Sequence, residues 1–177
     1  MTLSYSCSVL DAWWEVNLEA NVAVTKVTIY TRKNWGNGNM SMNPLSNSVV
    51  SLRNQLGTIL YSYGIGDISQ CPFIVVSVGK ASTAGTPSTL LVWRVRVELD
   101  GQNYLNLSEV HVYDAYGFNY AKNKPATQSS TYKDYKDYPA SNAVNGILTD
   151  FTNTNNDAGI YHTHERFTYA NHVIQTT

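Results

Sequence analysis

The strongest constraint on the fold is a strict two-residue alternation between Trp93 and Leu99. The odd-numbered residues of this segment are apolar and the even-numbered residues are charged. Side chains of a β-strand point alternately to its two faces, so the segment predicts a strand with one buried and one solvated face. The segment 104–113 alternates similarly, but its phase slips at Ser108-Glu109, where a bulge is predicted. Asp100-Gly101, between the two segments, is predicted to form a tight turn.

Short strands of this kind are expected throughout the first two thirds of the chain. No segment repeats apolar residues with the sustained spacing of an amphipathic helix. Further strands are predicted at residues 14–18, 22–30, 48–52, 57–63 and 73–78, separated by clusters of Asn, Gly and Ser. Residues 119–157 are polar and rich in turn formers. Many short strands separated by turns predict an all-β sandwich or barrel.

The composition favours a sugar ligand over other partner classes. Only 14% of residues are charged, whereas 43% are apolar and 13 are tyrosines. A polar, weakly charged surface offers the hydroxyl, amide and aromatic groups that bind sugars, although the same residues also suit a pleated sheet. The formal net charge of −1 argues against a nucleic-acid partner, which requires clustered Lys and Arg. The longest apolar stretches have the length of a strand, so no membrane span is expected.

Motifs of the common enzyme classes are missing from the sequence, which predicts that the protein is not an enzyme. It contains no Gly-x-Ser-x-Gly, no His-Glu-x-x-His and no phosphate-binding loop. The first residues lack the basic and apolar regions of a signal peptide, so a protein acting outside the cell is expected to be represented here by a fragment. Cys7 and Cys71 suit a disulfide or two buried thiols equally well.

Two segments of the polar region carry a specific pattern, Ala-Lys-Asn-Lys-Pro-Ala-Thr-Gln-Ser-Ser at 121–130 and Tyr-Pro-Ala-Ser-Asn-Ala-Val-Asn-Gly at 138–146. Together they resemble the opening of a discoidin domain, the C-type domain of coagulation factors V and VIII, whose family includes a fucose-binding lectin branch. The segments 13–18, 27–32, 92–99 and 104–113 are similar to middle and closing strands of the same family. The resemblance implies an eight-stranded jelly-roll β-sandwich of the galactose-binding-domain-like type.

The order of these segments is permuted relative to the family, in which the pattern at 121–130 comes first. Residues 1–116 resemble the back half of one repeat and residues 117–160 the front half of the next, so the sequence is expected to be cut from a tandem array. Because the termini of a domain often lie close together, the two halves are expected to close into one circularly permuted sandwich at 1–160. Residues 161–177 match nothing in the family and are expected to form a divergent or disordered tail.

The resemblance also implies a structural Ca²⁺ site. Carried over by position, the ligands are the carbonyls of Ser108, Asn142 and Ile147, the Asn145 side chain and the Glu109 carboxylate. Such oxygen ligands suit a hard cation. Asn145 stands where the family has Asp, so one negative charge is missing, and Asp150 is close enough in sequence to restore it. The alternative is a polar turn capped by its own Asn side chains.

The resemblance also implies a sugar site, but this sequence keeps fewer of the family's residues there than at the Ca²⁺ site. The fucose-binding branch uses one His and two Arg, of which only Arg32 keeps its place here; Asn153 falls near the His position, and Asn34 replaces an Asp. Trp35 is a candidate stacking platform for the apolar face of a sugar ring. The alternatives are that Arg32 is a solvated charge at a strand end and that Trp35 folds back onto the sandwich.

These expectations define a non-catalytic, lectin-like carbohydrate-binding or adhesion module of a secreted or cell-surface repeat protein. Its partner is expected to be a glycan or glycoprotein. The alternatives are a structural repeat without a ligand, the accessory domain of a larger carbohydrate-active enzyme, and a binder of phospholipid head groups. The oligomeric state is not indicated by the sequence.

Overall fold

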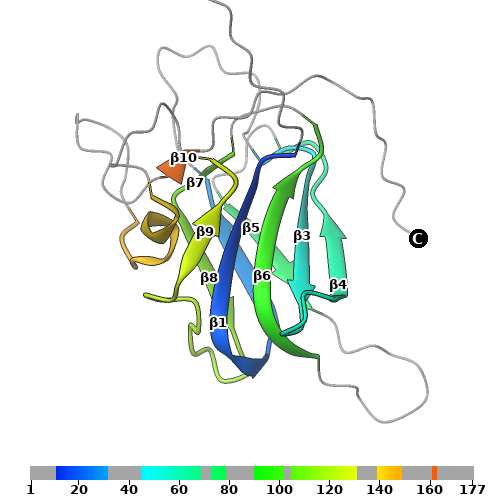
Figure 1. The fold of residues 1–177 in the computed structure, drawn as a ribbon, viewed down its shortest axis with the longest axis vertical. Coiled ribbons are helices and arrows are strands. Elements are labelled where there is room, and N and C mark those ends of the chain that lie inside the picture. Colours follow the sequence, from blue (N-terminus) through cyan, green and yellow to red (C-terminus); the bar gives the residue numbers. More distant parts are fainter. Residues whose placement is uncertain are drawn as a thin grey trace, which may run out of the picture.

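The computed structural model describes residues 11–31, 45–68, 73–78, 90–101, 105–130, 139–148 and 161–162. Within these ranges the chain forms short strands and a 3-10 helix, η2 (Ala140–Val144) (Figure 1). The strands are β1 (Trp13–Ala23), β2 (Lys26–Tyr30), β3 (Ser48–Arg53), β4 (Ile59–Gly64), β5 (Phe73–Ser77), β6 (Leu91–Leu99), β7 (Asn106–Leu107), β8 (Glu109–Tyr113), β9 (Ala126–Gln128) and β10 (Tyr161–His162). The predicted all-β class is confirmed.

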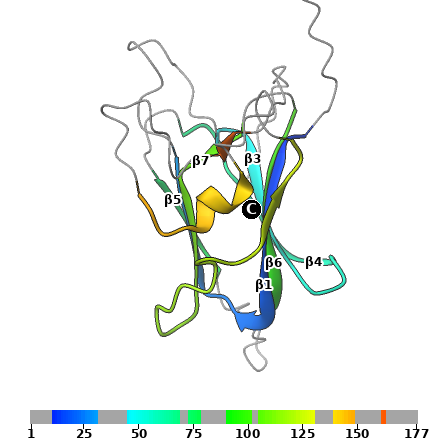
Figure 2. The same cartoon turned by 60° about the vertical axis from the view of Figure 1, so that its left-hand side comes forward.

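Two antiparallel sheets face each other and form a sandwich, which Figure 2 shows nearly edge-on. The larger sheet has the strand order β4-β3-β6-β1-β9 and the smaller has the order β5-β2-β8. In the described part of the chain these two sheets contain eight strands, and a further small sheet pairs β10 with β7. The predicted β-sandwich is therefore confirmed. No helix in the described ranges is long and apolar enough to cross a membrane.

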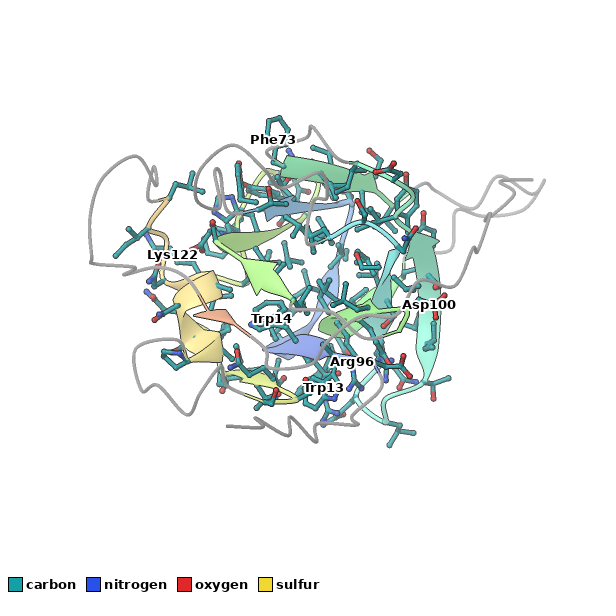
Figure 3. All side chains as sticks on the ribbon, turned by 90° about the horizontal axis from the view of Figure 1, so that it is seen from above. Trp13, Trp14, Phe73, Arg96, Asp100 and Lys122 are labelled. Atoms are coloured by element: carbon teal, nitrogen blue, oxygen red, sulfur yellow. The ribbon has the colours of Figure 1, made fainter. Side chains whose placement is uncertain are left out.

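The apolar sides of the alternating strands fill the space between the sheets. On β6, Val95, Val97 and Leu99 are buried, as the alternation predicts. Trp14 of β1 is the largest of the fully buried side chains and lies in the interior (Figure 3). Its indole Nε1 donates a hydrogen bond to the carbonyl of Ala140 at 2.9 Å, which ties η2 to the larger sheet. Apolar burial on both sheets provides the main stabilisation of such a sandwich.

The charged side of β6 lies on the outer face of the larger sheet. Glu98 Oε2 lies 3.2 Å from Arg96 Nε and 3.7 Å from Arg53 Nη2, so one carboxylate bridges two strands. The guanidinium carbon of Arg96 lies 4.0 Å from the centre of the Trp13 ring, a cation–π contact. These partly buried contacts lie within β6 and between β6 and its neighbours, and they keep the charged groups of β6 on the outer face of the sheet.

The outer edge of β1 is only partly covered by a neighbouring strand. β9 pairs with Trp14–Val16 alone, although β1 continues to Ala23. The register between β1 and β6 shifts between Asn17 and Val22, and within this stretch Glu19 has a positive φ of 59°. Trp93 lies opposite the shift and is half-buried, whereas the alternation alone predicts that it is buried.

At Ser108-Glu109, where the phase slip predicts a bulge, the chain instead passes from one sheet to another. β7 ends at Leu107 in the two-stranded sheet, and β8 begins at Glu109 in the three-stranded sheet. Four consecutive residues, 107 to 110, are buried, which a regular alternation does not allow. Glu109 pairs with Tyr30, so its side chain lies on the side of the small sheet opposite to the buried Val110. A carboxylate is therefore buried outside the main core.

Residues of the polar region pack directly against the strands that precede them. Asp114 closes the connecting turn, because its Oδ1 accepts hydrogen bonds from the backbone N–H groups of Tyr116 (2.9 Å) and Phe118 (3.0 Å). The N–H of Tyr120 then donates to the carbonyl of Val112 at 2.8 Å, and β9 joins the edge of β1. Of the predicted tail, Tyr161–His162 forms β10, and residues 163–177 lie outside the described ranges.

Candidate cation site

The two predicted sites differ in what the structure describes of them. The residues predicted to bind sugar, Arg32, Asn34, Trp35 and Asn153, lie outside the described ranges, as do Cys7 and Cys71. All five residues predicted to bind Ca²⁺ are described. Glu109 begins β8 and Ser108 immediately precedes it. Asn142, Asn145 and Ile147 come from η2 and the turn that follows it. The fold brings these two segments together.

Glu109 is the central residue of this site. Its side chain is 0% exposed, and its Oε1 accepts a hydrogen bond from the backbone N–H of Gly146 at 3.1 Å. The second oxygen, Oε2, is buried and has no hydrogen-bond partner among the described residues. Burying an ionised carboxylate oxygen without a partner lowers the stability of a protein by roughly several kcal/mol. The site therefore lacks a positive charge or a proton at this oxygen.

Burial raises the pKa of Glu109 from 4.5 to about 7. Three weaker effects act in the opposite direction, namely the N–H groups of Gly146 and Ile147 and the positive charge of Lys122. Desolvation disfavours the ionised carboxyl, and these partners offset only part of that cost. A cation held at Oε2 would supply the missing compensation and would take the place of the proton.

The turn after η2 is held in place by its own hydrogen bonds. Asn145 Oδ1 accepts the N–H of Ile147 at 2.8 Å, and Gly146 adopts a positive φ of 81°. This bond is the one expected from the alternative interpretation, a polar turn capped by Asn. An amide oxygen has two acceptor positions, so the same oxygen retains the capacity to bind a cation. The turn directs the N–H of Gly146 at Glu109 and leaves the Ile147 side chain 48% exposed.

Ser108 has a second polar group besides the carbonyl that is predicted to bind the cation. The residue is buried, its N–H donates to the carbonyl of Tyr30 at 2.8 Å, and its Oγ has no hydrogen-bond partner within the described part of the chain. Two adjacent residues thus each have a buried polar atom without a partner, Ser108 Oγ and Glu109 Oε2. Only its position next to Glu109, where the strand phase slips, indicates this hydroxyl in the sequence.

An aromatic cluster lies beside Glu109 on the outer face of the small sheet. The His111 ring is 5.1 Å from Tyr30 and 5.6 Å from Tyr113, both edge-to-face, and His111 Nδ1 lies 2.7 Å from the Tyr113 hydroxyl. His111 Nε2 lies 3.8 Å from Glu109 Oε1. Burial, followed by the charges of Lys122 and Lys26, lowers the pKa of His111, so this ring is not a cation for Glu109 at neutral pH.

The donor set fits a hard divalent cation better than a transition metal. The predicted ligands are one carboxylate (Glu109), an amide oxygen (Asn145) and the carbonyls of Ser108, Asn142 and Ile147. Oxygen ligands of this mixture are typical of Ca²⁺. The described residues contain no group of three or more His, Cys, Asp and Glu that could hold a metal ion. Asp150, the residue that would add a second charge, lies outside the described ranges.

The solved structures similar to this chain include a lectin domain and a fucose binding module. No protein-family model and no curated protein matches the chain. The lectin domain of lectinolysin complexed with Lewis b antigen is 25% identical, with a TM-score of 0.47, and the match covers 59% of this chain and 66% of that one. A fucose binding module of Streptococcus pneumoniae is 19% identical, with a TM-score of 0.44 and the same coverage.

The matched region thus spans slightly less than two thirds of each solved chain. Both neighbours are carbohydrate-binding modules by their descriptions. TM-scores below 0.5 do not establish a common function, so the assignment depends on the residues of this chain.

Proposed function

We propose that the chain is a non-catalytic, lectin-like carbohydrate-binding module whose loops are held by a structural Ca²⁺ at Glu109. The observation that carries the proposal is the buried Glu109 carboxylate, whose Oε1 accepts the Gly146 N–H and whose Oε2 has no partner among the described residues. This pairing joins the two segments that the discoidin resemblance assigns to one cation site. Nothing about the hydrophobic core requires a carboxylate at this position, so its presence favours a role in binding.

In this proposal Glu109, Ser108 and Asn145 hold the cation together with the carbonyls of Asn142 and Ile147. Bound Ca²⁺ supplies the charge that the buried carboxylate lacks and cross-links β8 to the turn after η2. The cation is structural, and no chemical step is assigned to it. The protein would then resemble other sandwiches whose binding loops are placed by a rigid scaffold.

The proposed sugar-binding segment begins at the same end of the sandwich. Tyr30, the last residue of β2, is the pairing partner of Glu109, and Arg32 follows it by two residues in the sequence. An Arg offers several N–H donors to sugar hydroxyls, and Trp35 offers an aromatic face. The proposed ligand is therefore a glycan or glycoprotein. The proposed setting is a secreted or cell-surface protein with tandem repeats, of which this chain holds the back half of one and the front half of the next.

A glycan array probed with the Ca²⁺-loaded protein tests the proposal. The variants Arg32→Ala and Trp35→Ala are expected to lose the array signal, whereas Arg53→Ala, a matched loss of charge on the outer face of the larger sheet, is expected to keep it. Unchanged glycan binding in both test variants would show that the sugar site does not include Arg32 or Trp35. If wild-type protein binds Ca²⁺ but no glycan, the chain is a structural repeat, an alternative favoured by the missing second Arg.

A further inference from the structure

Lys122 lies against the candidate cation site, although no sequence pattern assigned it a role. If a methyl group were built on Gly146, it would lie only 2.9 Å from Cε and 3.4 Å from Nζ of Lys122. The end of this side chain therefore crosses the very residue whose N–H binds the Glu109 carboxylate. Figure 3 shows Lys122 beside η2 at the side of the sandwich. Its positive charge acts on both Glu109 and His111.

Backbone contacts on both sides fix the position of Lys122. The preceding residue, Ala121, is fully buried, and the N–H of Tyr120 before it donates to the Val112 carbonyl of β8 at 2.8 Å. The following residue, Asn123, donates its N–H to the carbonyl of Val144 at 2.7 Å, at the end of η2. Since these bonds anchor the turn to β8 and η2, the lysine is held over the site by the fold.

The neighbouring lysine, in contrast, is already neutralised elsewhere. Lys124 Nζ forms an ion pair with Glu19 Oε2 at 3.0 Å. Lys122 forms no ion pair with another described residue, and its side chain is exposed enough to swing away from Gly146. Two adjacent cations of the same turn thus have different environments. Of the two, only Lys122 lies beside Gly146 and acts electrostatically on Glu109.

We propose that the Lys122 ammonium is a tethered counter-ion of Glu109 that competes with the bound cation and so sets the Ca²⁺ affinity of the site. The inference rests on the cation site proposed above. A single lysine charge near Glu109 partly compensates the carboxylate when the site holds no metal. Calcium entry places a second positive charge next to the first, so the lysine must swing out or tolerate the repulsion. Either effect weakens binding by an electrostatic amount that salt reduces.

Isothermal titration calorimetry with CaCl₂ on the whole chain tests the inference. The variant Lys122→Met is expected to bind Ca²⁺ about tenfold more tightly than wild type, a modest effect because the ammonium is exposed and screened by water. The matched control Lys124→Met removes the same charge two residues away and is expected to leave the affinity unchanged. The gain in Lys122→Met should shrink when KCl is raised from about 0.05 to 0.5 M. Lys122→Gln, which keeps a polar end, serves as a second variant if the methionine variant folds poorly.

Each outcome has a defined meaning. If wild type and both Lys122 variants bind Ca²⁺ with equal affinity, Lys122 does not compete with the cation, although the proposed cation site itself is not contradicted. An equal gain in the Lys124→Met variant would also overturn it, because the effect would then reflect net charge alone. If neither wild type nor the Lys122 variants bind Ca²⁺, the cation site itself is wrong and the inference falls with it. Binding in Lys122→Met without binding in wild type supports the inference in its strongest form.

Discussion

Replacement of Glu109 by Gln offers the sharpest test of the site, because it removes the charge and nearly preserves the shape. The pKa of Glu109 is about 7 in the folded protein against 4.5 for a free carboxyl. The native state therefore retains a proton on this group in a pH range where the unfolded chain has lost it. Between pH 4.5 and 7 the native state binds more protons, so the free energy of unfolding falls as the pH rises.

The magnitude follows from the same two values. One unit of pKa corresponds to about 1.4 kcal/mol, so above pH 7 the ionised carboxylate destabilises the metal-free protein by about 3 kcal/mol. Glutamine never ionises and avoids this loss, and its amide oxygen accepts the Gly146 N–H as the neutral carboxyl does. In chelator at pH 8, Glu109→Gln is therefore expected to be about 3 kcal/mol more stable than wild type. At pH 4 the two proteins are expected to have similar stabilities.

Urea unfolding in EDTA at pH 4, 6 and 8, followed by tryptophan fluorescence, measures this difference. Addition of Ca²⁺ at pH 8 should then reverse the ranking, because only the wild type has the carboxylate that binds the cation. If the free energy of unfolding changes with pH in the same way in both proteins, Glu109 does not have a raised pKa, and the reasoning is refuted. A stabilisation by Ca²⁺ that is equal in both proteins would place the cation elsewhere.

Three further substitutions test the scaffold around the site. Gly146→Ala is expected to destabilise the protein by about 1–3 kcal/mol in urea unfolding, because a residue with a Cβ is strained at its positive φ, whereas Gly66→Ala, which has open space around it, should have a small effect. Trp14→Phe should cost about 3 kcal/mol, since it leaves a cavity and an unpaired Ala140 carbonyl; a melting temperature within 2 °C of wild type would contradict this. Asp114→Ala should cost about 1–2 kcal/mol through the loss of two hydrogen bonds in the turn, measured by the shift in urea midpoint.

The strands could be predicted from the sequence wherever each face has a single environment. Val95, Val97 and Leu99 are buried as the alternation requires, because one side of β6 faces the core and the other faces water. The turn at Asp100-Gly101 was less informative, since β6 and β8 belong to different sheets and the turn does not form a hairpin. Local residue preferences cannot distinguish a hairpin from a crossing between sheets.

The candidate site shows the same division between local and long-range information. The phase slip at Ser108-Glu109 could be seen in the sequence, but the burial of Glu109 depends on a turn more than 30 residues away. The position of Lys122 over Gly146 depends on how two turns pack together, which no periodicity contains. The predicted sugar-binding residues lie outside the described ranges, so Arg32 and Trp35 remain predictions.

The incompletely covered edge of β1 has a consequence for how copies of such a module coexist at high density. A long, regular and unpaired edge invites another chain to add a strand, which is a common origin of aggregation. Here the register shift and the positive φ at Glu19 distort the exposed stretch, and the Glu19–Lys124 ion pair places charges along it. The edge of β1 is therefore irregular and charged, and it does not offer regular backbone groups for another copy to pair with. A variant in which this edge is made regular would be expected to aggregate.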